Sequence, residues 1–306
     1  MGCPTWREPT PHDKDLLFKA ANENAVMACT DSYANVILYR KKYETLVCSC
    51  GGLVLRKYHR LEKTDRDIAE NHILYGFPLG TGDIRAAIDF LTHDAAAEGI
   101  PLAFPLLSAE QKLFLERKMP NHYTFTERRD DSDYLDLTKN LADLPGGKYH
   151  KKKNHISQFK RKYPEAEYRP ITVENADDAR RIEDEWYAAN DGDADRDKRF
   201  EKEIIDEALA LFDVLNLTGG ILYVAGRPVA MTMGSPITEQ VADVHFEKAV
   251  PGFDRDGAFA VINQLYAKTM TQYEYLNREE DLGIEGLRKA KLSYHPDILL
   301  AKWIAA

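Results

Sequence analysis

Apolar and polar residues alternate along the first half of the chain in a pattern that predicts one α/β unit. Apolar residues between positions 16 and 21 recur at helical spacing and predict a first helix. Three β-rich runs at 36–39, 45–50 and 53–58 follow, and the pair Gly51-Gly52 separates the last two, which is typical of an antiparallel meander. Beyond them we expect a helix near 83–91, a strand near 102–107, a helix near 109–117 and a strand at 123–127.

A similar order of elements follows after Pro170. The pattern predicts a long basic helix at about 147–163, with Ile156, Phe159 and Tyr163 as its apolar stripe. We then expect a strand at 167–171, helices at 176–190 and 198–215, strands at 221–224, 229–233 and 241–249, and a helix at 258–270. The residues Ala-Gly-Arg-Pro between the first two of the later strands are a hairpin signal.

The run from Tyr275 to Pro296 is predicted to be a short strand, an acidic turn and a helix that begins near 284. Asp281 can cap this helix, which carries Arg288 and Lys291 three residues apart. One interpretation is a capped surface helix in which Glu285 pairs with its own lysine and arginine neighbours. The other is a site where carboxylates, Glu280 among them, move protons and cations hold a phosphate or an oxyanion.

The strand at 241–249 offers a second set of ionisable residues. Period-two alternation places Asp243, His245 and Glu247 on one face of the strand. A buried histidine is often only a core residue with satisfied hydrogen bonds, but three ionisable groups on one face also indicate a site in a cleft.

Two glycine-bearing turns that precede predicted helices are candidates for anion binding. One contains Gly80 and Gly82, and the other contains Gly257 with Arg255 beside it. Each is also consistent with a simple helix entry.

Composition restricts the class of protein. The chain has 306 residues, 44% hydrophobic and 30% charged, which suits a globular protein of two domains. No apolar run approaches the roughly 20 residues that span a bilayer, and no signal segment begins the chain. We therefore expect a cytoplasmic protein. The cysteines Cys3, Cys29, Cys48 and Cys50 match no zinc or redox spacing and are interpreted as reduced packing residues.

Charge is distributed unevenly. The net charge is −9, yet the segment 148–162 concentrates lysine and arginine. It is either a solvated helix between domains or a grip for phosphate groups.

Three segments together resemble a known family: Gly146–Ile156, Val241–Ala249 and Tyr275–Pro296. They are similar to standalone bacterial proteins related to the C-terminal cytosolic domain of phosphatidylglycerol lysyltransferase, and more distantly to Fem-type aminoacyltransferases. The resemblance covers most of the chain. It implies an α/β fold of two tandem GNAT-like domains, each a mostly antiparallel mixed sheet flanked by helices, at 1–143 and 144–306. It also implies transfer of an aminoacyl group from charged tRNA.

The leading hypothesis is therefore an aminoacyl- or acyltransferase acting on a hydroxyl or amine, with a small molecule or a lipid as acceptor. Its candidate catalytic residues are His245, Glu247, Glu280, Arg288 and Lys291. Its candidate substrate-binding and anion-binding residues are Lys148, Lys151, Lys152, Lys153, Asn154, Asn277 and Tyr294. No metal is expected.

Two alternatives stay open at this point. One is an N-acetyltransferase that uses acetyl-CoA, whose pyrophosphate would lie over the Arg255–Gly257 turn. Only these two residues match the GNAT phosphate loop, and Asp254 and Asp256 oppose phosphate, so we expect weak CoA binding. The other alternative is a non-catalytic adaptor that binds RNA or an anionic membrane. The amino acid, the acceptor and the oligomeric state are not determined by the sequence.

Overall fold

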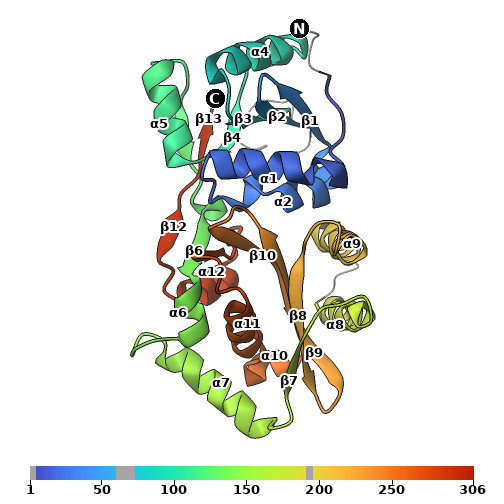
Figure 1. Cartoon of the computed structure of the whole chain (residues 1–306). Coiled ribbons are helices and arrows are strands. Elements are labelled where there is room, and N and C mark those ends of the chain that lie inside the picture. Colours follow the sequence, from blue (N-terminus) through green and yellow to red (C-terminus); the bar gives the residue numbers. More distant parts are fainter. Residues whose placement is uncertain (1–4, 60–72, 191–195) are drawn as a thin grey trace. The chain divides into compact units, whose positions relative to one another are not determined.

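The computed structural model describes residues 5–59, 73–190 and 196–306, which fold as two compact units (Figure 1). The first unit comprises residues 1–133, 280–284 and 299–306, and the second comprises 134–279 and 285–298. In this division the first long run of the chain ends at Asp133, and the second unit begins at Tyr134. The last strand also returns to the first unit, because it pairs with two strands there.

The first unit contains two three-stranded antiparallel sheets, β1-β2-β3 and β4-β13-β5. Its strands are β1 (Thr45–Cys50), β2 (Leu53–Tyr58), β3 (Leu74–Gly80), β4 (Phe104–Leu107), β5 (Phe125–Glu127) and β13 (Trp303–Ala305). Its α-helices are α1 (Lys14–Glu23), α2 (Tyr33–Leu38), α3 (Arg40–Tyr43), α4 (Ile84–Ala97) and α5 (Ala109–Lys118), with 3-10 turns at Pro11–Asp13, Cys29–Asp31 and Arg129–Asp131.

Local sequence explains the β1–β2 hairpin. Gly51 and Gly52 both have positive φ angles, 57° and 84°, which a two-residue hairpin turn of the primed type requires. Side chains from both sheets then pack with α4 in one apolar core, which includes Leu55, Phe77, Ile88 and Phe104.

The prediction of a strand at 36–39 is wrong. Residues Tyr33–Leu38 form helix α2, because the Ser32 side chain accepts a hydrogen bond from the Asn35 N–H at 3.1 Å and caps the helix. The apolar side chains that resembled a strand are buried on this helix.

The second unit is built on a seven-stranded sheet of order β12-β6-β11-β10-β9-β8-β7 (Figure 1). β10 pairs with β11 in parallel, whereas the pairs β9–β10, β6–β11, β7–β8 and β8–β9 are antiparallel. The strands are β6 (Asp133–Leu137), β7 (Glu167–Pro170), β8 (Thr218–Val224), β9 (Arg227–Pro236), β10 (Val241–Ala249), β11 (Tyr275–Asn277) and β12 (Ile298–Leu300). The helices are α6 (Thr138–Asp143), α7 (His150–Lys162), α8 (Ala176–Ala189), α9 (Arg196–Ala210), α10 (Phe253–Asp256), α11 (Ala258–Thr269) and α12 (Glu285–Leu292).

Helices cover both faces of this sheet, and two neighbouring residues of β10 identify the faces. Glu247 accepts a hydrogen bond from Asn263 of α11, whereas the Lys248 ammonium bonds Glu201 of α9 and lies 3.8 Å from the ring centre of Trp186 in α8. Successive side chains of a strand point to opposite faces. Helix α11 therefore covers one face, and α8 and α9 cover the other.

The predicted fold class is confirmed: the chain is α/β, with mostly antiparallel sheets flanked by helices. Within the described ranges, no helix combines the length and the apolar character needed to cross a membrane. Cys29 and Cys48 are buried and Cys50 is half-buried, and Cys3 lies outside the described residues.

Gly234 in β9 is expected to tolerate no side chain. A Cβ there would overlap the Asp243 carbonyl oxygen and the Tyr266 hydroxyl, whereas a Cβ on Gly286 in α12 meets nothing within 4 Å. We predict that Gly234→Ala lowers the free energy of unfolding by about 2 kcal/mol or more. The matched variant Gly286→Ala should instead raise it by up to about 1 kcal/mol through helix propensity. Urea unfolding measures both, and equal effects would contradict the packing argument.

Candidate functional site

A cluster of buried and half-buried ionisable side chains lies on the α11 face of the second unit's sheet. Its centre is Tyr294, which follows α12 and is buried. The Lys152 ammonium of α7 lies 3.7 Å from the Tyr294 ring centre, and the Arg278 guanidinium, just beyond β11, lies 4.3 Å from it. Cations at this distance are attracted by the negative face of an aromatic ring. Burial holds the pKa of the Tyr294 hydroxyl well above its ordinary value, so the ring stays neutral.

Two carboxylates complete this cluster. Asp136 of β6 is buried, and one of its oxygens lies 3.9 Å from an Arg278 nitrogen. Burial raises the pKa of Asp136 to about 6, although Arg278 opposes the shift. Burial also raises the pKa of Glu247, again against the influence of Arg278. Both carboxyl groups are therefore protonated more readily than surface carboxylates are.

The pKa of Lys152 is shifted in the opposite direction, below its ordinary value. Burial lowers its pKa to about 8, the positive charge of Arg278 lowers it further, and Glu247 and Asp136 oppose the change. A lysine with a pKa near the working pH can give and accept a proton at neutral pH, which an ordinary surface lysine does poorly.

Several polar atoms of this cluster have no hydrogen-bond partner among the described residues. They are both carboxylate oxygens of Asp136, the Tyr149 hydroxyl, the Asn263 amide oxygen and one Arg278 nitrogen. Burial raises the pKa of Tyr149 to about 12, and the negative charge of Asp136 adds to the shift. Most buried polar groups in proteins are hydrogen-bonded. A group of donors and acceptors of this kind is typical of a site for a polar ligand.

The two cations predicted to act together on α12 differ in environment. Lys291 is buried, and its ammonium donates to the main-chain carbonyl of Arg278, so it positions that residue. Arg288 is half-buried on the same helix.

His245 and Glu247 do not share one face, contrary to the alternation read from the sequence. A β-bulge between Val244 and Phe246 inserts one residue, which reverses the alternation beyond it. Glu247 therefore points to α11, whereas His245 lies with Asp243 and Ser235 on the opposite face. Asn277 is buried, and its side chain accepts a hydrogen bond from the Glu279 N–H at 2.7 Å.

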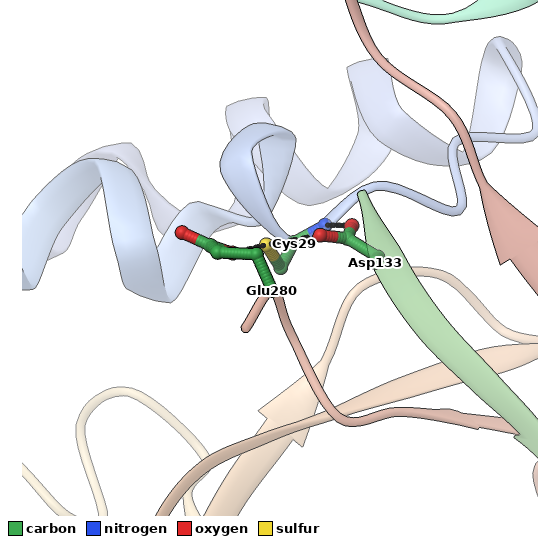
Figure 2. Close-up of side chains that lie close together, drawn as sticks. All are labelled: Cys29, Asp133 and Glu280. Carbon is green, nitrogen blue, oxygen red and sulfur yellow. Dashed lines mark hydrogen bonds between the residues drawn. The ribbon is translucent and has the colours of Figure 1, made fainter. Parts of the chain in front are cut away.

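Glu280 belongs to a separate cluster, in the first unit. Figure 2 shows its carboxylate beside the Cys29 thiol, with Asp133 on the other side of the sulfur. The sulfur lies 3.3 Å from Glu280 and 3.2 Å from Asp133. The buried Lys302 ammonium lies 3.5 Å from the same sulfur. Cys29 is thus part of a polar network, beyond the packing role expected from its spacing.

Both glycine turns have structural explanations. Gly257 has a φ of 104°, and a Cβ there would press on the His155 carbonyl of α7. Arg255 is exposed, and the amides of Gly252 and Arg255 already donate to the Asp254 side chain at 2.8 and 2.7 Å. Gly80 and Gly82 pack against the main chain of the Gly51-Gly52 turn.

Helix α7 matches the predicted basic helix. Lys148, Lys151, Lys153 and Asn154 are exposed along it or just before it, and Lys152 alone of this group turns inward.

Sequence reasoning missed Asp136, Arg278 and Asn263. An aspartate inside the apolar strand Asp133–Leu137 was the available signal, because strand interiors disfavour aspartate. Arg278 lies next to the acidic turn, and no sequence pattern indicated a role for it.

The model of the phosphatidylglycerol lysyltransferase C-terminal family matches residues 25–306. A protein of unknown function from Bacteroides thetaiotaomicron is similar over 99% of both chains, with 36% identity and a TM-score of 0.92. The C-terminal domain of a protein named as a lysylphosphatidylglycerol synthetase, from Agrobacterium fabrum, is 13% identical with a TM-score of 0.64, over 97% of this chain and 92% of that one. FemX is 8% identical with a TM-score of 0.56, over 98% and 96%. No curated protein matches. The resemblance read from the sequence is confirmed.

We expect Asp136→Asn to stabilise the protein at neutral pH. The pKa of Asp136 is about 6 in the folded chain, against an ordinary value of 3.8. The folded state therefore holds the proton more tightly, and wild-type stability falls as the pH rises from about 4 to about 6. An asparagine side chain does not ionise, so the variant does not lose stability over this pH range. It should be more stable than the wild type by about 1 to 3 kcal/mol at pH 7.5, with a smaller difference at pH 4.5.

Denaturant unfolding at the two pH values measures the effect. Asp143→Asn, an exposed position in the neighbouring helix α6, is the control and should change stability by less than about 0.5 kcal/mol. A pH-independent difference between Asp136→Asn and wild type would contradict the raised pKa.

Proposed function

This chain belongs to the family of the phosphatidylglycerol lysyltransferase C-terminal domain, and from that premise we propose that it transfers an aminoacyl group from charged tRNA to a hydroxyl or amine acceptor. The observation that carries the proposal is the buried carboxylate of Asp136, which lacks hydrogen-bond partners among the described residues beside the two cations of the cluster.

The aminoacyl end of a charged tRNA carries an ammonium group next to an ester. An ammonium bound at Asp136 or Glu247 would supply the missing hydrogen bonds and would favour the charged carboxylate. Burial strengthens this electrostatic contact, because the local dielectric is low. The cluster thus suits a ligand that brings its own positive charge, as an aminoacyl group does.

The chemical step needs a base, an oxyanion partner and a leaving group. We assign the base to Lys152, whose pKa of about 8 leaves a neutral fraction at working pH. It accepts the proton of the acceptor O–H or N–H as that atom forms a bond to the ester carbonyl carbon. The carbon–oxygen bond to the tRNA ribose then breaks, and the proton passes from Lys152 to the ribose oxygen.

Arg278 is the residue we assign to the developing oxyanion. Its guanidinium is held by the Tyr294 ring, and one of its nitrogens has no hydrogen-bond partner among the described residues. A donor positioned in advance costs little reorganisation when charge develops on the carbonyl oxygen.

Helix α7 presents exposed lysines next to this cluster, and we assign them to tRNA phosphates. Lys148, Lys151 and Lys153 lie on the solvent side, while Lys152 of the same helix enters the cluster. One helix would thus connect the nucleic acid with the reacting ester. A lipid with a free hydroxyl, or a small amine, fits the acceptor role.

The acetyl-CoA alternative has weaker support. Phosphate would have to displace the Asp254 carboxylate from the two amides it already occupies, and Asp256 of the same turn pairs with Lys162 at 2.6 Å.

We predict that the full chain transfers label from tRNA charged with radioactive amino acids, lysine first, to phosphatidylglycerol vesicles or to small amines. Lys152→Met should lower the transfer rate by about 10² to 10⁴ fold, because it removes the base. Lys268→Met, at an exposed lysine near the end of α11 to which we assign no role, should retain nearly the wild-type rate. In the wild type, the rate should rise with pH up to about 8 as Lys152 loses its proton.

Two results would count against this proposal. Transfer from labelled acetyl-CoA, with none from any charged tRNA, would favour the acetyltransferase. Transfer from tRNA that is equally fast in both lysine variants would keep the reaction but remove Lys152 from it.

Binding of tRNA should weaken with salt, because phosphate contacts release counterions. Each contact adds about −0.9 to the slope of log K against log salt concentration for duplex nucleic acid. The double variant Lys148→Ala/Lys151→Ala should therefore flatten the slope by about one to two. Lys268→Ala, an exposed lysine at the end of α11, should leave it unchanged. Equal slopes for all three proteins would indicate that α7 is only a solvated helix.

A further inference from the structure

Three metal-binding atoms meet on the face of the second unit's sheet opposite α11. They come from Asp243 and His245 of β10 and from Glu279, two residues beyond β11. The His245 Nδ1 atom lies 3.5 Å from an Asp243 oxygen and 3.4 Å from a Glu279 oxygen. The sequence indicated no metal site, because Glu279 lies 34 positions after His245. The bulge and the parallel pairing of β10 with β11 bring these residues together.

The spacing of these atoms suits a shared metal ion better than direct hydrogen bonds. Good N–H···O bonds have heavy-atom distances of about 2.7–3.2 Å, and both distances here are longer. Zinc bonds nitrogen and oxygen at about 2.0–2.1 Å in tetrahedral geometry, which separates neighbouring ligand atoms by about 3.3–3.4 Å. The observed distances are close to that value.

The other ring nitrogen of His245 supports the same assignment. Nε2 lies 2.8 Å from the Ser235 hydroxyl oxygen. When Nε2–H donates to that oxygen, the Nδ1 lone pair faces the two carboxylates. Metal-binding histidines are commonly oriented by such a partner on the second nitrogen. Ser235 itself is fully buried, so it suits the support of His245 and is out of reach for attack on a substrate.

Glu279 is the partly exposed member of this group of three side chains. The Asp243 and His245 side chains are fully buried, whereas the Glu279 side chain is 19% exposed. Its backbone has a φ of 55°, and its N–H donates to Asn277. Glu279 is thus held with its carboxylate toward His245.

We propose that Asp243, His245 and Glu279 bind one divalent transition-metal ion of the zinc type, with a solvent molecule as fourth ligand. Two carboxylates and a neutral imidazole are oxygen and nitrogen ligands of the kind that such an ion binds. The ion would tie β10 to the segment that follows β11. This site is separate from the Asp136 cluster, since it lies on the other face of the sheet, and it does not depend on the proposed reaction.

The Cys29 cluster of the first unit is the natural comparison, because it also groups three potential ligands. There the Lys302 ammonium is bonded to Asp133 at 2.5 Å and lies beside the sulfur. A cationic group of the chain thus takes the place that a metal would need, so we assign no metal to that cluster.

Metal titration of the full chain tests the proposal. The protein is stripped with a chelator and titrated with Zn²⁺ against a chromophoric competitor, and we expect one ion per chain with micromolar or tighter affinity. Co²⁺ should give the intense visible bands of a four-coordinate site. Asp243→Asn and Glu279→Gln should each weaken binding by about 100-fold or more, and Ser235→Ala by about 10- to 100-fold. Zn²⁺ should also raise the thermal unfolding midpoint of the wild type.

Cys29→Ser is the matched control and should bind as the wild type does. Circular dichroism establishes that each variant is folded before titration. Absence of binding by the wild type at 100 µM Zn²⁺ would overturn the proposal. So would loss of binding in Cys29→Ser, or unchanged binding in both Asp243→Asn and Glu279→Gln, because each result would place the ion elsewhere.

Discussion

The arrangement of charges around the Tyr294 ring is the constraint on which the second unit's candidate site depends. Ionised groups lose hydration when they are buried, and they are tolerated only where opposite charges or dipoles replace the water. Here the ring face holds Lys152 and Arg278, and Asp136 and Glu247 offset their charge. The compensation is incomplete, so the pKa of Asp136 rises while that of Lys152 falls. Groups that titrate near neutral pH are the outcome, and such groups are useful in proton transfer.

A single extra residue in β10 separates the unit's two polar groups of side chains. Without the bulge, His245 and Glu247 would share a face, as the alternation of the strand predicts. With it, Glu247 joins the charges beside α11, and His245 joins Asp243 and Glu279 on the other face. Bulges redirect side chains in this way and occur often near functional sites. One strand thus contributes side chains to two separate clusters of ionisable residues.

Local sequence signals predicted most helices and strands, because their causes are local. The glycine pair of the β1–β2 turn, the apolar stripe of α7 and the extent of β10 agree with the structure, although the alternation along β10 is reversed by its bulge. The failure at Tyr33–Leu38 also has a local cause, since the Ser32 cap outweighs the preference of its valine and isoleucine for strands. For the candidate site, the sequence correctly located Lys152 on a basic helix but did not indicate that this lysine alone turns inward.

The sequence by itself determined the family, the α/β class and the concentration of positive charge on one helix. The family follows from the resemblance of three segments of the sequence, whereas the class and the charge distribution follow from composition and periodicity. Only the tertiary structure decided which ionisable residues meet. Asp136, Lys152 and Glu247 come from β6, α7 and β10, and Arg278 follows β11, while Glu280 joins Cys29 in the other unit. Their pKa values depend on burial and on neighbours across the sheet, and no pattern along the chain records either.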